Sequence, residues 1–279
     1  MWIKLKDIKN PIAFDGVQEL VEILTQVLRG WTVRDVKPGK GKPKIRLSAG
    51  PLGYERRSPW IEGGDATVLV DPVDAVCDLL LDLERAYIED SDNLLVLHAA
   101  GVKMGAGLIV FPSTHASGKS LLTATLAHAG HRVFADDQLP IVPSTPTIGI
   151  APGFLPRLRR PLPNDIDSRV LDFIHQHEGP MSERFRYVDL NEDVLAPLGE
   201  RAPIVGLVVL NRQTGAKPKM ETLSEQEVLK ACVLQSFGRQ MNAIEVLDHL
   251  HGMVKGAECL KLTYGTVLEA QALLQEKFA

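Results

Sequence analysis

Residue types that can do chemistry are concentrated between residues 94 and 142 of the 279-residue chain. The centre of this stretch is Gly118-Lys119-Ser120, which follows an apolar run at 108–111 and precedes a helix-like segment at 121–129. The first N–H groups of a helix have no partners within the helix, and the helix dipole favours negative charge there. In such a loop, glycine lets the backbone approach a phosphate, lysine reaches the outer phosphates and serine can bind Mg²⁺.

A pair of carboxylates follows the next element. An apolar segment at 132–135 has the composition of a buried strand and ends in Asp136-Asp137. Carboxylates at the end of a strand beside a phosphate loop are where a metal ion and a proton acceptor are needed. Strand, loop, helix and aspartate pair together predict a site for a nucleoside triphosphate, with ATP and Mg²⁺ as the expected cofactors.

The loop departs from the standard pattern G-x-x-x-x-G-K-[ST]. The first glycine of that pattern is replaced by Ser113, and Ala116 stands where many such loops carry glycine. The alternative interpretation is a strand, turn and helix in which the lysine is incidental. The residues predicted to contact the nucleotide are Ser113, Thr114, His115, Ala116, Ser117, Gly118, Lys119, Ser120 and Leu121.

Composition narrows the class of protein. The chain has 45% hydrophobic and 24% charged residues and a formal net charge of −4, which is ordinary for a globular protein. It lacks the broad basic surface expected of a nucleic-acid-binding protein, and no apolar run approaches the roughly 18 residues of a membrane span. Three separated cysteines predict core thiols in a reducing compartment. No secretory signal is visible at the start, so we expect a cytoplasmic protein without nucleic-acid or membrane partners.

The pattern of apolar residues predicts two units, an N-terminal α+β layer at 1–90 and a core at 91–279. Helices are expected at 17–28, 71–83, 120–129, 165–175, 224–236, 243–254 and 267–278. Strands are expected at 31–36, 44–47, 54–57, 67–70, 94–97, 108–111, 132–135, 204–210 and 259–264. We expect the turn at 103–107 to join strands 94–97 and 108–111 as a hairpin, and residues 175–180 to form a polar connection.

Several of these motifs together resemble a known group of proteins. They are His98 in V-L-H-A-A-G-V, the loop at 113–120, the run His131-Arg132-Val133-Phe134-Ala135-Asp136-Asp137, and the closing Lys261-Leu262-Thr263-Tyr264-Gly265. This set resembles the C-terminal catalytic domain of HPr kinase/phosphorylase and the broader group of HPr-kinase-like bacterial serine kinases. The resemblance covers roughly residues 60–279 and is concentrated in 94–142.

The resemblance implies an α/β fold with a phosphate-loop nucleotide-hydrolase (NTPase) core of the phosphoenolpyruvate-carboxykinase and HPr-kinase type. It implies that Lys119 binds the β- and γ-phosphates and that Ser120 binds Mg²⁺. One aspartate would act as base and the other would bind the metal; we assign Asp136 to the first role and Asp137 to the second. Adjacent strand residues point to opposite sides, so both can serve only if the chain turns there. His98 would lie beside the aspartate and tune its pKa; the alternative is a hydrogen-bonded core histidine.

A cationic cluster at 157–160 stands in place of the glycine-rich segment with which HPr kinase/phosphorylase grips its protein substrate. We expect Arg157 or Arg160 to stabilise the charge that develops on a transferred phosphoryl group. The alternative is a solvated basic loop.

The predicted function is an ATP-dependent kinase that transfers the γ-phosphoryl group to a hydroxyl of a protein, a peptide or a small metabolite. The alternative is a nucleotide-binding regulatory or interaction module without phosphotransfer, which the altered loop favours. A nucleotide-independent scaffold is a third reading. The resemblance also implies that the chain could assemble into a homo-oligomer.

Overall fold

The chain forms a mixed α/β structure. The structure is a computed structural model that describes residues 1–39, 42–61, 65–91, 93–113, 117–237 and 241–279. Within these residues it has three sheets and seven helices, α1 Glu19–Val27, α2 Pro72–Asp90, α3 Lys119–His128, α4 Ser168–Gln176, α5 Glu225–Leu234, α6 Ala243–Lys255 and α7 Val267–Phe278. No helix in these ranges is both long and apolar enough to cross a membrane.

The N-terminal residues form a six-stranded sheet of order β3-β1-β2-β4-β5-β6. The strands are β1 Trp2–Leu5, β2 Ile12–Asp15, β3 Val33–Val36, β4 Ile45–Gly50, β5 Gly53–Arg57 and β6 Thr67–Leu69. The alternating burial of β1, with Ile3 and Leu5 inside, marks it as a strand with one covered face. We did not predict β1 and β2, each of four residues.

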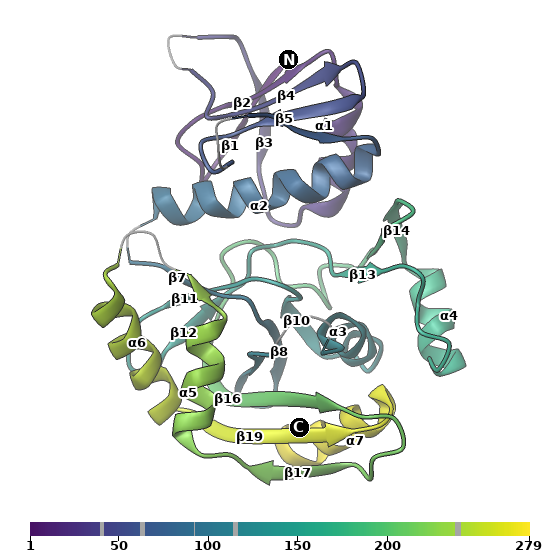
Figure 1. Cartoon of the computed structure of the whole chain (residues 1–279), viewed down its shortest axis with the longest axis vertical. Coiled ribbons are helices and arrows are strands. Elements are labelled where there is room, and N and C mark those ends of the chain that lie inside the picture. Colours follow the sequence, from purple (N-terminus) through teal and green to yellow (C-terminus); the bar gives the residue numbers. More distant parts are fainter. Residues whose placement is uncertain (40–41, 62–64, 92, 114–116, 238–240) are drawn as a thin grey trace.

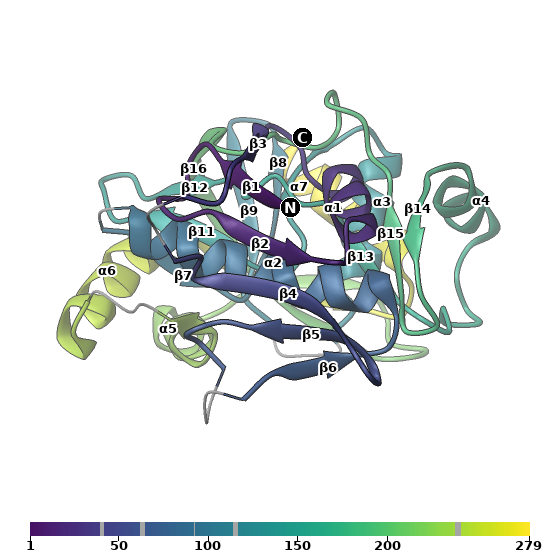
Figure 2. The same ribbon diagram turned by 90° about the horizontal axis from the view of Figure 1, so that it is seen from above.

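Helix α2 lies between this sheet and the rest of the chain (Figures 1 and 2). It begins as predicted, because the Asp71 carboxylate accepts hydrogen bonds from the N–H groups of Val73 and Asp74, and Pro72 fits the first turn. It continues to Asp90 rather than ending near residue 83. Its apolar residues belong to one cluster with buried side chains of both the N-terminal sheet and the core. The two layers therefore share a continuous hydrophobic interior.

The core is a ten-stranded sheet in which β10-β8-β9-β16-β12-β11-β7-β18 are neighbours in that order, with β19 added to β16 and β17 to β19. Its strands are β7 Leu95–Leu97, β8 Ala100–Met104, β9 Gly107–Phe111, β10 Arg132–Ala135, β11 Leu139–Val142, β12 Ile148–Ile150, β16 Arg201–Arg212, β17 Lys219–Thr222, β18 Ser236–Phe237 and β19 Glu258–Tyr264. Three adjacent strands, β9, β16 and β19, run parallel. Their carboxyl ends therefore meet at one edge of the sheet.

Helices cover both faces of these parallel strands. Val208 and Leu210 of β16 pack into the cluster that contains the apolar residues of α3 and α7. Leu207, one position away, packs instead with Val228 of α5 and Leu250 of α6. This alternation is what a strand buried on both faces requires, and Figure 1 shows α5 and α6 on the opposite side from α3.

Two local predictions were wrong. The hairpin partner of β9 is β8, and β7 pairs instead with β11 and β18. The error arose because Ala100 and Gly101 are poor strand formers in isolation, although both are buried in the sheet. The second concerns residues 175–180, where strand β14 (Glu178–Met181) pairs with β15 (Phe185–Val188). Together with β13 (Arg157–Arg159) they form the small sheet β13-β15-β14.

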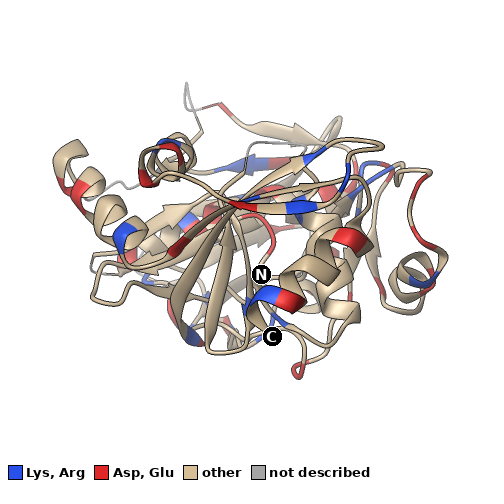
Figure 3. Ribbon diagram, turned by 90° about the horizontal axis from the view of Figure 1, so that it is seen from below, with Lys and Arg blue, Asp and Glu red and all other residues tan. Residues whose placement is uncertain are grey.

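Charged residues of both signs are interspersed over the helices and strands in the view of Figure 3. One buried ion pair connects the N-terminal sheet to helix α2. Arg56 of β5 donates to the carboxylate of Asp82 on α2 and also to Asp78, 3.3 Å away, while the Asp82 side chain is fully buried. Breaking a buried pair by removing one partner leaves an uncompensated charge.

We therefore expect Asp82→Ala to lower the free energy of unfolding by about 3–5 kcal/mol, because Arg56 would stay buried without its main partner. Asp15→Ala is the matched control, since its pair with Arg46 is exposed and should contribute about 0–1 kcal/mol. Urea unfolding followed by circular dichroism measures both. Equal losses in the two variants would contradict the assigned role of the buried pair.

Candidate functional site

The loop before α3 has the backbone geometry of an anion site. Gly118 is the N-cap of α3 and has φ +90°, a conformation that residues with a side chain rarely adopt. A Cβ atom there would lie 3.1 Å from the Tyr264 hydroxyl. Gly118 is thus required both by its conformation and by the close approach of a neighbouring strand. The predicted contacts Thr114, His115 and Ala116 lie outside the described residues.

The departure at Ser113 has a structural explanation. The Ser113 side chain is buried, and its hydroxyl accepts a hydrogen bond of 2.9 Å from the N–H of Leu210 on β16. Its carbonyl accepts a hydrogen bond of 2.6 Å from the ammonium of Lys119. Serine therefore anchors the start of the loop to the parallel sheet, where the standard pattern has glycine.

Two further residues lie beside the loop at the ends of neighbouring parallel strands. The Tyr264 hydroxyl at the end of β19 donates to the Ser117 carbonyl, 3.2 Å away. At the end of β16, Arg212 pairs with Asp165 at 2.6 Å and lines the cavity above the loop. We did not predict either residue. Their position at the carboxyl ends of parallel strands could have identified them, because ligands of open α/β sheets bind outside these ends.

A cavity of about 240 Å³ lies over the N-terminus of α3. Its lining residues are His98, Ser117, Gly118, Lys119, Ser120, Leu121, Asp136, Asp137, Arg157, Leu158, Arg159, Pro161, Leu162, Pro163 and Arg212. Residues 117–121 of the predicted loop, both aspartates and His98 thus face one space. The chain leaves strand geometry after Ala135, and this turn is what lets adjacent carboxylates point into the same cavity.

Asp136 is the buried member of the pair. Its Oδ2 accepts a hydrogen bond of 2.9 Å from the Arg157 N–H, and its Oδ1 is buried without a hydrogen-bond partner in the described part of the chain. Burial raises the pKa of this carboxyl to about 7; the charge of Asp137 adds to the rise, while hydrogen bonds from Arg157 and Ser120 and the charge of Lys119 oppose it. A carboxyl with a pKa near neutrality can accept a proton effectively.

Asp137 lies nearer to solvent, with 40% of its side chain exposed. Its Oδ1 is 3.4 Å from His98 Nδ1, and its Oδ2 is 3.6 Å from Nη2 of Arg157. The Nε2 of His98 lies 3.5 Å from Lys119 Nζ, so the imidazole bridges lysine and aspartate. The pKa of Lys119 is lowered by burial, although the two aspartates partly offset this.

The two arginines of the cationic cluster have different positions. Arg157 lies over the Phe185 ring at 4.4 Å and contacts Cys77 and Asp137, so its guanidinium is held at the wall of the cavity. Arg160 does not line this cavity and donates to the Ser182 carbonyl at 2.6 Å instead. Of the two arginines, Arg157 alone therefore lines the cavity that holds the aspartates.

These groups fit a nucleotide triphosphate with magnesium. The α3 N-terminus offers backbone N–H groups to phosphates, and Lys119 lies beside it. Mg²⁺ commonly takes one or two protein oxygens and completes its coordination with phosphates and water, and Ser120 and Asp137 can supply such oxygens. Among the described residues, no group of three or more His, Cys, Asp or Glu side chains could hold a metal ion by itself.

Comparison with known proteins gives no sequence match and a distant structural likeness. No protein-family model matches the chain, and no curated protein matches its sequence. Among solved structures, the Hpr(Ser) kinase/phosphatase from Coxiella burnetii matches 65% of this chain and 93% of its own, with 11% sequence identity and a TM-score of 0.33. This likeness is too distant to assign a fold family or an activity, so the resemblance of the sequence motifs stays a prediction.

The pKa of Asp136 has a consequence for stability. Because the folded-state pKa is raised, the folded protein retains a proton that the unfolded chain has lost, and stability falls as the pH rises from about 4 to about 7. Asparagine cannot ionise. We expect the stability of Asp136→Asn relative to the native chain to increase by on the order of 2 kcal/mol between about pH 5 and pH 8.

Urea unfolding at the two pH values measures this difference. Asp35→Asn, at an exposed position of β3, is the control and should change stability little at either pH. A constant difference between Asp136→Asn and the native chain across this range would contradict the raised pKa.

Proposed function

We propose that this protein is an ATP-dependent kinase that transfers the γ-phosphoryl group of Mg·ATP to a hydroxyl. The observation that carries the proposal is the shared cavity, in which a glycine-capped helix N-terminus, Lys119 and two carboxylates face one another. A phosphate site alone fits many proteins. A buried carboxyl with a pKa near 7 at the same site is what proton removal from an alcohol needs.

The division of roles follows from the positions of the residues. Lys119 and the N-terminus of α3 bind the phosphates, while Ser120 and Asp137 hold the magnesium that neutralises them. Arg157, at the wall opposite the loop, stabilises charge on the transferred group. Asp136 accepts the proton of the acceptor hydroxyl. His98 lies between Asp137 and Lys119 and holds both side chains in position.

A nucleotide-binding regulatory module without phosphotransfer is the second candidate. Its support is the replacement of loop glycines by Ser113 and Ala116. Ser113, however, anchors the start of the loop through its hydrogen bonds with Leu210 and Lys119, and does not obstruct the loop. A pure binding module has no need of a buried carboxyl beside the phosphate loop, which favours the kinase.

The first test is Mg·ATP binding by calorimetry. The native chain is expected to bind, Lys119→Ala to lose about 10- to 100-fold in affinity with its charge-assisted contact, and Asp136→Asn to bind within a few-fold of the native chain. Lys103→Ala, at an exposed position of β8, should leave binding unchanged. Absence of binding by the native chain at millimolar Mg·ATP or Mg·GTP would contradict both candidate functions.

A mimic of the transferred phosphoryl group can test whether Arg157 and Arg160 differ in their contribution to binding that group. Mg·ADP with aluminium fluoride is expected to bind Arg157→Ala about 100-fold less tightly than the native chain, because a donor to the developing charge is lost. Mg·ADP alone should bind both proteins similarly. Arg160→Ala is the matched control, since Arg160 does not line the cavity. A larger loss in Arg160→Ala than in Arg157→Ala would overturn the assignment.

A further inference from the structure

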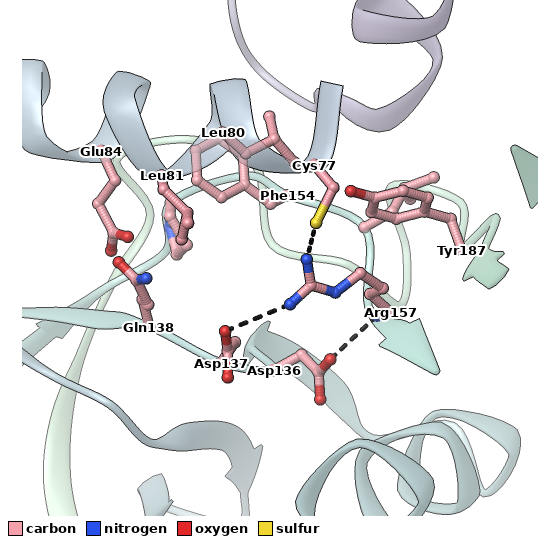
Figure 4. A pocket seen from close by; sticks show the side chains of 12 residues that line it. Cys77, Leu80, Leu81, Glu84, Asp136, Asp137, Gln138, Phe154, Arg157 and Tyr187 are labelled. Carbon is pink, nitrogen blue, oxygen red and sulfur yellow. Dashed lines mark hydrogen bonds and ion pairs between the residues drawn. The ribbon is translucent and has the colours of Figure 1, made fainter. Parts of the chain in front are cut away.

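A second cavity, of about 60 Å³, adjoins the larger one at Asp136, Asp137 and Arg157, and Figure 4 shows its lining residues. These three residues line both cavities. The remaining lining residues are Cys77, Leu80, Leu81, Glu84, Gln138, Pro152, Phe154, Leu155 and Tyr187. The proposed base, Asp136, therefore lies where the larger cavity over α3 and this smaller space meet.

Helix α2 forms the roof of this second cavity. Cys77, Leu80, Leu81 and Glu84 line it from positions three, four and seven apart, which is one face of a helix. Figure 4 shows these side chains hanging from α2 toward the aspartates and Phe154. The N-terminal layer thus supplies one wall of a space that opens onto the proposed base.

Two residues that line this cavity carry buried polar atoms without a hydrogen-bond partner in the described part of the chain. The Tyr187 hydroxyl and Asp136 Oδ1 are both buried without a hydrogen bond within the described part of the chain. Tyr187 is 1% exposed and Asp136 is 8% exposed. Buried polar groups are almost always hydrogen-bonded, so two residues of the cavity lining carry hydrogen-bonding capacity that the described part of the chain does not use.

Glu84 adds a third polar group to an otherwise apolar face of α2. Its side chain is 2% exposed, and the side-chain amide of Gln138 lies beside it. Burial raises the pKa of the Glu84 carboxyl well above its ordinary value, and the charge of Asp137 adds to this. The protonated carboxyl can donate as well as accept a hydrogen bond.

We propose that this cavity binds the phosphoryl acceptor, and that the acceptor is a small alcohol with a second hydrogen-bonding group. The inference rests on the proposed kinase function and names its substrate class. One hydroxyl would lie at Asp136, the body against Leu80 and Phe154, and the second group near Glu84.

The size of the cavity sets the class of acceptor. One water needs about 10–15 Å³ of such space, so the cavity holds about four to six non-hydrogen atoms. This fits a diol or an amino alcohol of two to four carbons. A serine within a folded protein could enter this cavity only if its main chain passed the residues of α2 that line it.

The transfer step forms one bond to the γ-phosphorus, breaks another, and moves one proton through Asp136. The acceptor oxygen forms a bond to the γ-phosphorus as its proton moves to Asp136. The bond from the γ-phosphorus to the bridging oxygen breaks and ADP leaves. Asp136 then releases the proton to solvent, and the product is a phosphate monoester.

The test measures ADP formation from Mg·ATP with ethylene glycol, 1,3-propanediol and ethanolamine as probes, and identifies products by phosphorus NMR. The native chain should form a phosphate monoester with at least one probe, with saturation. Leu81→Trp places a bulky ring in the cavity from a half-buried position and should lower kcat/KM for that probe by about tenfold or more. Leu52→Trp, at an exposed turn, should change neither kcat/KM nor Mg·ATP affinity.

Glu84→Gln tests where the second hydrogen-bonding group of the acceptor binds, because KM and kcat should respond differently to this change. Its effect should fall on KM for 1,3-propanediol, with propan-1-ol, which lacks the second hydroxyl, unaffected. The expected change is about tenfold, the value of one hydrogen bond. Equal effects on the two alcohols would overturn the placement of the second group at Glu84.

The outcomes separate the two proposals. If the native chain binds Mg·ATP but no probe is phosphorylated, or if Leu81→Trp matches the native chain, the acceptor pocket is overturned and the nucleotide site stands. Phosphorylation of a serine peptide that Leu81→Trp leaves unchanged would likewise overturn it in favour of a polypeptide acceptor. If the native chain does not bind Mg·ATP, both proposals fall.

Discussion

The site depends on the way Asp136 is held at the end of β10. Two adjacent carboxylates in an extended strand would point to opposite faces. Here the strand ends at Ala135, and the N–H of Arg157 fixes the Asp136 carboxylate inside the protein. Asp137 is left nearer to solvent. One turn of the chain thus gives neighbouring carboxylates different environments, and the proposed roles of proton acceptor and metal ligand rest on this difference.

Arg157 extends this constraint to the rest of the molecule. Its backbone binds Asp136, and its guanidinium contacts Asp137 and also Cys77 on α2, while its position is fixed by the Phe185 ring. The core sheet, the small sheet β13-β15-β14 and the N-terminal layer therefore meet at one side chain. A change in the position of α2 would be transmitted to the aspartates through it.

The sequence was informative where structure is determined locally. Gly118 at the start of α3, Asp71 at the start of α2 and the aspartates after β10 lie where local patterns predict them. Residues brought in from distant segments were missed, because no local pattern records which strands become neighbours. Tyr264 and Arg212 reach the loop only because β19 and β16 run parallel to β9. The same limit applies to Arg157 and Arg160, which are equivalent in sequence but separated by the end of β13.

Under the proposed function, two adjoining cavities would address a problem common to kinases, the competition between water and the intended acceptor. The larger cavity has the charged groups that phosphates and magnesium need. The smaller one is lined largely by Leu80, Leu81, Phe154 and Leu155, and such walls favour an acceptor with an apolar body over water. Among the described residues, Asp136, Asp137 and Arg157 are the ones that line both spaces. A hydroxyl held by the apolar walls would meet the base and the phosphoryl group together, whereas water there would leave apolar contacts unmade. The N-terminal layer would then act in selecting the acceptor, because α2 completes the smaller cavity.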